Sequence, residues 1–150
     1  MVYPQVNDPV SIPCGTPNGT LFVPVNRTYG EQKTDPLTRK RISLEDCARG
    51  YWREANLTAS RGFNCDWLMA TSFGRIVGVW KIDKYYGWLE PKLTPKATWP
   101  GDPSIYPNNN QGLSRRGCIL IPVDKATWDK FVGQEVCLGR NPNPLRGYFV

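Results

Sequence analysis

Two apolar runs that flank a short glycine-containing connection constrain the fold of this chain more than any other feature. Residues 66–71 read DWLMAT, and residues 75–83 read RIVGVWKID, a segment rich in β-branched side chains. The connection Ser72-Phe73-Gly74 between them has the length and the glycine of a hairpin loop. We therefore predict a β-hairpin over residues 66–83 with a loop of three to four residues.

The second strand of this hairpin has apolar residues on both of its faces. Strict alternation would place Ile76 and Trp80 on one face of the strand, and Val77 and Val79 on the other. A strand that is apolar on both faces is typical of the centre of a sheet, so we predict that it is the central strand of a small barrel. Gly78 inside the strand indicates a bend, a bulge, or the close approach of another backbone or of a ligand.

The rest of the chain predicts short elements joined by turns, because glycine and proline number 14 each. Further strands are expected at residues 20–25, 118–123 and 145–150, and short helices at residues 43–50 and 124–132. Ser43 and Asp124 are the expected N-caps of these helices. Residues 51–60 fit a strand, a helix or both, and residues 90–117 form a long irregular loop.

These elements predict the α+β class, as a small mixed β-barrel with two or three short helices. We expect a single domain over residues 1–150. Within it, residues 1–42 would be an irregular N-terminal extension packed on a core formed by residues 43–150.

The residue types that are missing exclude several kinds of chemistry. The chain contains no histidine, which removes Ser-His-Asp and Cys-His nucleophile systems and most catalytic zinc sites. Its five cysteines form no Cys-x-x-Cys pair, so a zinc ribbon or a thioredoxin-type site is not expected. We predict a protein that is not an enzyme and has no metal or cofactor. A small enzyme that uses Asp66, Asp83 or Lys84 on nucleotides stays an alternative.

The charge of the chain favours an anionic partner. Nineteen lysines and arginines against thirteen acidic residues give a net charge of +6, which favours nucleic acid and also fits an ordinary basic surface. No apolar run is long enough to span a membrane, and the first residues lack the basic and apolar regions of a signal peptide. We therefore predict a cytoplasmic protein with reduced thiols and no membrane association.

Two blocks of sequence resemble a known superfamily. The first is ARGYWREANLTASRGFNCDWLMATSFGRIVGVWKID at residues 48–83, and the second is WDKFVGQEV at 128–136 followed by NPNPLRGYFV at 141–150. A short helix before a strand hairpin, and a closing strand after an Asn-Pro turn, resemble bacterial and phage proteins of unknown function with a PUA-like barrel, a superfamily that includes PUA, ASCH, EVE and YTH domains. The chain departs from this pattern in its first 42 residues, in its long loop, and at Phe73, where family members often have Asn.

The resemblance implies a pseudobarrel that binds RNA or DNA and holds one extruded base in an aromatic-walled pocket. Stacking on an aromatic ring contributes about 1–3 kcal/mol per base, while arginine and lysine hold flanking phosphates. On this basis Trp52, Tyr85 and Trp88 would stack, and basic side chains would contact phosphate. The full set of candidate residues is Trp52, Arg53, Trp80, Lys84, Tyr85, Tyr86, Trp88, Arg115, Arg116, Asn143 and Arg146.

Each candidate also has a purely structural interpretation. Trp80 lies among aliphatic residues and fits a core position better than a ligand site. Aromatic residues at strand ends also seal barrel openings, and Asn143 also fits a turn. An alternative function is a phage or mobile-element factor that binds a host protein through residues 90–117 and the N-terminal region, since loops often carry binding sites.

Overall fold

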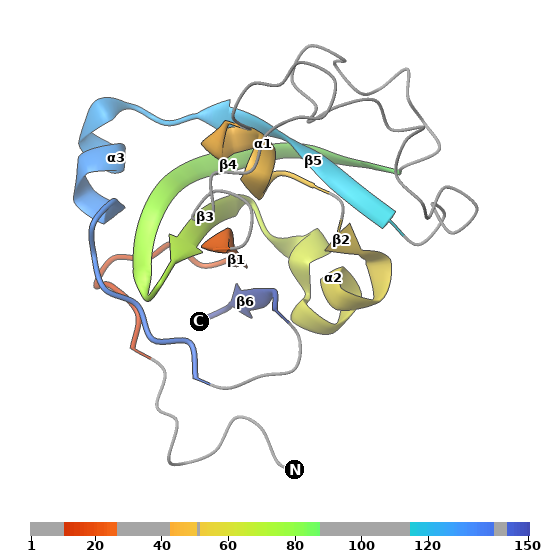
Figure 1. Cartoon of the computed structure of the whole chain (residues 1–150), viewed down its shortest axis with the longest axis horizontal. Coiled ribbons are helices and arrows are strands. Elements are labelled where there is room, and N and C mark those ends of the chain that lie inside the picture. Colours follow the sequence, from red (N-terminus) through yellow and green to blue (C-terminus); the bar gives the residue numbers. More distant parts are fainter. Residues whose placement is uncertain (1–10, 27–42, 51, 88–114, 140–143) are drawn as a thin grey trace.

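The computed structural model describes residues 11–26, 43–50, 52–87, 115–139 and 144–150, and shows an α+β fold (Figure 1). Its strands are β1 (Thr20–Pro24), β2 (Trp52–Arg53), β3 (Trp67–Ser72), β4 (Arg75–Gly87), β5 (Arg115–Pro122) and β6 (Arg146–Tyr148). Its helices are α1 (Leu44–Ala48), α2 (Glu54–Ser60), α3 (Lys125–Phe131) and the 3₁₀ turn η2 (Gly62–Asn64). The predicted α+β class is confirmed. The predicted loop at residues 90–117 lies almost entirely outside the described residues.

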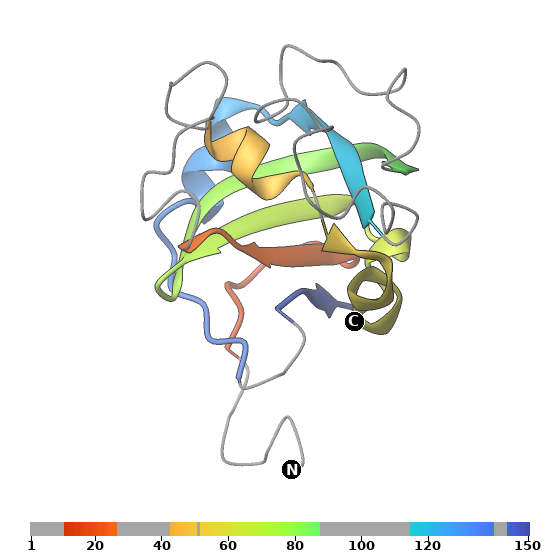
Figure 2. The same cartoon turned by 45° about the vertical axis from the view of Figure 1, so that its right-hand side comes forward.

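The six strands form one sheet in the order β2-β5-β4-β3-β1-β6, in which only β1 and β3 run parallel. Strands β5, β4, β3 and β1 lie side by side in Figure 2, and the long strand β4 is strongly arched in Figure 1. The hairpin's second strand is central, as predicted. Among the described residues no strand pairing joins the edges β2 and β6, so the sheet itself is open.

The position of strand β1 differs from the predicted division of the chain into an extension at residues 1–42 and a core at residues 43–150. It lies between β3 and β6, and Leu21 and Phe22 are fully buried. Pro24 occupies the last position of the strand, where a missing N–H does little harm to the ladder. Residues 20–24 therefore belong to the central sheet, and the prediction that the first 42 residues are an extension outside the core is wrong for this part. The apolar character of TLFVP on both faces explains its burial on both sides.

The hairpin of β3 and β4 is confirmed, but its loop is shorter than predicted. Ser72 pairs with Arg75, which leaves only Phe73 and Gly74 as the turn. Their φ angles are 49° and 79°, the pair of positive values that a type I′ turn requires. Phe73 is therefore a non-glycine residue in the left-handed region, and its side chain is 79% exposed.

A bulge in β4 overturns the predicted division of its side chains between two faces. Ala70 pairs with Gly78 and Thr71 pairs with Ile76, so Val77 is an extra residue opposite the partner strand. As a result, Ile76 lies in one core cluster and Trp80 in the other. The expectation that they share a face is wrong, because a single inserted residue reverses the alternation that precedes it.

Gly78 accommodates a neighbouring side chain of its own strand. A Cβ atom at this position would lie within 3.0 Å of the indole ring of Trp80 and 3.2 Å from Leu44 Cδ2. The glycine thus lets the tryptophan lie against the backbone beneath α1. Of the three predicted explanations for this glycine, a bulge is observed directly beside it at Val77, while the group that approaches it closely is a side chain and not a backbone or a ligand.

Two hydrophobic cores cover the two faces of the sheet. The first core lies beneath α1 and α2 and contains Leu21, Val23, Val25, Ala48, Leu57, Cys65, Leu68, Ala70, Trp80, Cys118, Leu120 and Leu145. The second core lies beneath α3 and contains Phe22, Met69, Ile76, Val79, Phe131 and Val136. With both faces covered, the central strands need apolar residues at successive positions, which explains their continuous apolar sequence.

Both predicted N-caps are confirmed. The Ser43 hydroxyl accepts a hydrogen bond from the Asp46 N–H at 3.1 Å, and the Asp124 carboxylate accepts one from the Thr127 N–H at 2.8 Å. Hydrogen bonds from Thr127 hold the pKa of Asp124 below its usual value. Residues 51–60, which fitted a strand or a helix, contain both, because β2 ends where α2 begins.

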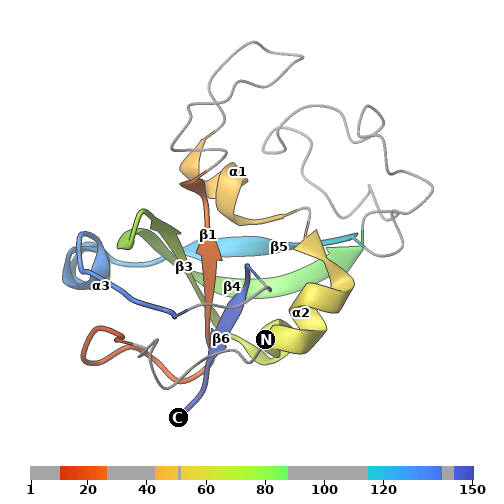
Figure 3. The same ribbon diagram turned by 60° about the horizontal axis from the view of Figure 1, so that its bottom comes forward.

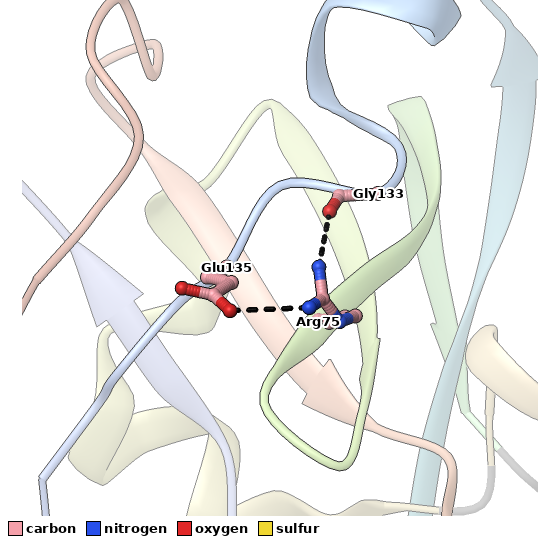
Figure 4. Close-up of polar contacts among 3 residues, drawn as sticks. All are labelled: Arg75, Gly133 and Glu135. Atoms are coloured by element: carbon pink, nitrogen blue, oxygen red, sulfur yellow. Dashed lines mark hydrogen bonds and ion pairs between the residues drawn. The ribbon is translucent and has the colours of Figure 1, made fainter.

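The chain after α3 is held against the start of β4 (Figure 4). Arg75 donates hydrogen bonds to the Gly133 carbonyl at 3.0 Å and to the Glu135 carboxylate at 3.1 Å. Backbone hydrogen bonds between Ile76 and residues 133 and 134 support the same contact. The Arg75–Glu135 pair is exposed and contributes little stability by itself, so the backbone bonds fix this segment.

Candidate nucleic-acid interface

Strand pairing gathers six of the predicted residues at one corner of the sheet, including Tyr85, which pairs with Cys118. Trp52 pairs with Arg116 and Arg53 pairs with Arg115, while Tyr86 of β4 pairs with Gly117 on the other side of β5. We call the end of β2, β5 and β4 formed by residues 52–53, 85–87 and 115–118 the arginine corner. About two fifths of the chain separates β2 from β5 in sequence, so only the folded sheet creates this cluster of basic and aromatic positions.

Tyr85 holds the arginine corner against the turn that follows α2. Its hydroxyl donates a 2.5 Å hydrogen bond to the carbonyl of Gly62, and its ring meets Phe63 edge to face at 5.2 Å. Burial is the main cause that raises the pKa of Tyr85, so the hydroxyl stays protonated and donates. Trp52 and Tyr85 both pack against the first core. Part of the Trp52 ring and part of the Tyr85 ring therefore contribute to the core and are not available to a ligand.

Replacing Tyr85 with phenylalanine is expected to lower the free energy of unfolding by about 1–2 kcal/mol, because the Gly62 carbonyl loses its donor. The aromatic ring remains, so any stacking on it is retained and nucleic-acid affinity should not change. Urea denaturation of Tyr85→Phe beside the native protein measures the first effect. An unaltered unfolding midpoint would contradict the structural role that we assign to this hydroxyl.

The remaining predicted residues are distributed differently. Trp80 is 5% exposed and meets Trp128 of α3 edge to face at 5.7 Å, so it is a core residue and leaves the candidate site. Lys84 is exposed on β4, opposite Ile119. Trp88 and Asn143 lie outside the described residues. Arg146 lies on β6, at the opposite edge of the sheet.

A hollow beside β6 contains two arginines, only one of which was predicted. It has a volume of about 410 Å³ and is lined by residues 59–61, residues 145–147 and Phe149; we call it the arginine hollow. The guanidinium of Arg61 lies 4.0 Å from the centre of the Phe149 ring. The Nε atom of Arg146 is buried and has no hydrogen-bond partner within the described part of the chain. Burial lowers the pKa of Arg146.

Arg61 occupies an unusual backbone position for an arginine. Its φ is 60°, in the left-handed region that glycine or asparagine adopts more readily. The position follows α2 directly and begins η2, whose Cys65 N–H bonds back to Gly62. Sequence reasoning missed this residue. The only signal was the pair Arg61-Gly62, and it suggests that the glycine, rather than the arginine, takes the left-handed conformation.

Helix α2 connects the arginine corner to the arginine hollow. It begins at Glu54, directly after β2, and ends at Ser60, which lines the hollow. Figures 1 and 3 both show it beside β6. Seven residues of helix extend about 10 Å, so the two basic sites lie about two helical turns apart. The helix follows the edge strand β2, and its last residue, Ser60, lies against Gly147 of the other edge strand, β6.

Two of the cysteine thiols lie in the core. Cys65 and Cys118 are buried, and burial raises the pKa of Cys65 to about 12 and that of Cys118 further, so both thiols stay protonated and unreactive. Within the described ranges, no group of three or more histidine, cysteine, aspartate or glutamate residues lies close enough together to hold a metal ion.

None of the helices described in the structure could cross a membrane.

Comparison of the chain with protein-family models, with curated proteins and with solved structures gives no match.

Proposed function

We propose that this protein is a nucleic-acid-binding module with a PUA-like barrel, in which α2 completes the wall that the strands leave open. The observation that carries the proposal is the arginine corner, where β2 and β5 bring Arg53, Arg115 and Arg116 beside Trp52. Three arginine residues on two paired strands would provide charge for phosphates, and an aromatic residue at the same level of the sheet would provide a stacking surface. The net charge of +6 adds long-range attraction for a polyanion.

Binding of this kind has a characteristic dependence on salt. Each phosphate contact releases condensed counterions, so the affinity for nucleic acid falls steeply as the salt concentration rises. The first experiment is therefore a titration of the protein with short single-stranded and duplex RNA and DNA, with and without modified bases, at low and moderate salt. Saturable binding that weakens with salt supports the proposal. Failure to bind any of these at low salt would overturn it.

The residues of the corner are tested by the double change Arg115→Gln, Arg116→Gln. Loss of two phosphate contacts is expected to reduce the slope of log affinity against log salt by about 1.8 for duplex DNA and about 1.4 for a single strand, and to weaken binding at low salt about tenfold or more. Fluorescence anisotropy with a labelled oligonucleotide measures both. The matched control is Arg75→Gln, which removes one exposed guanidinium at the other end of β4. Because the control loses one charge and the double variant loses two, a loss in the control half as large as in the double variant would mean that only overall charge matters.

A second candidate function is binding of a host protein. The observation that favours it is Phe73, a 79% exposed aromatic ring on a turn with a positive φ. Exposed aromatic residues often anchor protein interfaces. Recovery of one stoichiometric protein partner that resists nuclease treatment and is lost in Phe73→Ala would favour this function over the first.

A further inference from the structure

We propose that the arginine hollow is a binding site for one nucleoside monophosphate unit, either free or within a single strand. This goes beyond the proposed function, because the site lies at the other sheet edge from the arginine corner and requires a base and a phosphate together. The phosphate would bind Arg146, and the base would lie flat on the guanidinium of Arg61.

The charge of the hollow points to an anion. Arg61 and Arg146 both line it, and among the described residues of its lining none is acidic. The buried Nε of Arg146 has no acceptor there, although guanidinium groups at buried positions are normally hydrogen-bonded. The Arg146 side chain lines the hollow, so a phosphate there would bind the N–H groups of the same planar guanidinium that face it.

The second arginine provides a flat surface instead of a second phosphate contact. The Arg61 guanidinium already lies on the Phe149 ring at 4.0 Å, which fixes its plane. Arg61 is exposed, so its other face is open to a ligand. Nucleic-acid-binding proteins commonly stack unpaired bases on guanidinium planes as well as on aromatic rings. Phe149, Arg61 and a base would then form a three-layer stack.

The size and rigidity of the hollow fit a small ligand. A volume of about 410 Å³ is within the range of about 300–1,000 Å³ that small-molecule sites occupy. Both walls are held by the fold: Gly147 of β6 pairs with Leu21 of β1, and η2 is tied to β4 by the hydrogen bond from Tyr85 to Gly62. A wall fixed in this way loses little entropy when a ligand binds.

The test uses isothermal titration calorimetry with AMP, adenosine, inorganic phosphate and a short oligoadenylate as probes. AMP is expected to bind at least tenfold more tightly than adenosine or phosphate alone, because only AMP reaches both arginines. Arg146→Gln and Arg61→Gln should each lower the affinity for AMP about tenfold or more. Arg75→Gln, which removes an equal charge outside the lining of the hollow, and the corner variant Arg115→Gln, Arg116→Gln should leave the affinity for AMP unchanged. Far-ultraviolet circular dichroism checks that each variant folds.

The probes also separate the two sources of the nucleotide. If AMP gives no heat but Arg146→Gln weakens the oligoadenylate, the hollow takes its nucleotide from a strand. If AMP binding depends on Arg146 while oligoadenylate binding does not, the ligand is a free mononucleotide. AMP affinity that is unchanged in both Arg146→Gln and Arg61→Gln, with unchanged oligoadenylate affinity, would overturn the inference. Absence of all oligonucleotide binding, with AMP binding intact, would overturn the proposed function and leave this one standing.

Discussion

Replacing Gly147 with alanine is expected to destabilise the protein by about 3 kcal/mol or more, measured as the free energy of unfolding in urea. A Cβ atom on residue 147 would lie within 3.0 Å of the Ser60 carbonyl oxygen, far inside van der Waals contact. The same atom would lie 3.0 Å from the Phe149 ring. Because the obstacle at Ser60 is backbone, the clash is relieved only if α2 and β6 move apart.

The matched control for Gly147→Ala is Gly133→Ala. Residue 133 has a φ of 95° and no atom within 4 Å of an added Cβ, so this change tests backbone strain without crowding. It is expected to cost about 1–2 kcal/mol. Gly147 has no such positive φ, so its larger loss would report contact alone. If Gly147→Ala left stability unchanged, α2 would not approach β6 closely, and the proposal that this helix completes the wall of a barrel would fail.

The hairpin could be predicted from sequence because its signals are local. DWLMAT and RIVGVWKID are adjacent, β-rich and joined by a glycine-containing turn. Its register could not be predicted in the same way. When both faces of a strand are apolar, the alternation that normally fixes the faces carries no information, and the extra residue at Val77 leaves no mark on the pattern.

The candidate site likewise contains residues that a local sequence signal predicts and residues that it does not. The residues of the arginine corner were singled out because each is an aromatic or basic residue at a predicted strand end, a property visible in the sequence. The arginine hollow depends on distant segments that meet through α2, and its ring Phe149 and its left-handed Arg61 give no local signal. Contacts of this kind follow from the path of the chain, which short-range patterns do not specify.

Replacing Trp80 with alanine is expected to lower the free energy of unfolding by about 3–5 kcal/mol, the usual loss when a buried tryptophan is truncated. The indole fills the first core and meets Trp128 edge to face at 5.7 Å, so its removal opens a cavity and breaks the contact between β4 and α3. Urea denaturation measures the loss. A variant that kept native stability but lost nucleic-acid binding would return Trp80 to the candidate site.

A double-mutant cycle with Gly78 separates packing from any other role of this ring. Gly78→Ala alone forces its Cβ against the indole and is expected to cost about 1–3 kcal/mol. In the Trp80→Ala background the obstacle is gone, so the same change should cost much less, and the two effects should not add. Additive losses would mean that the ring does not lie on Gly78. Coupling would assign Trp80 to the core and keep it out of the candidate nucleic-acid interface.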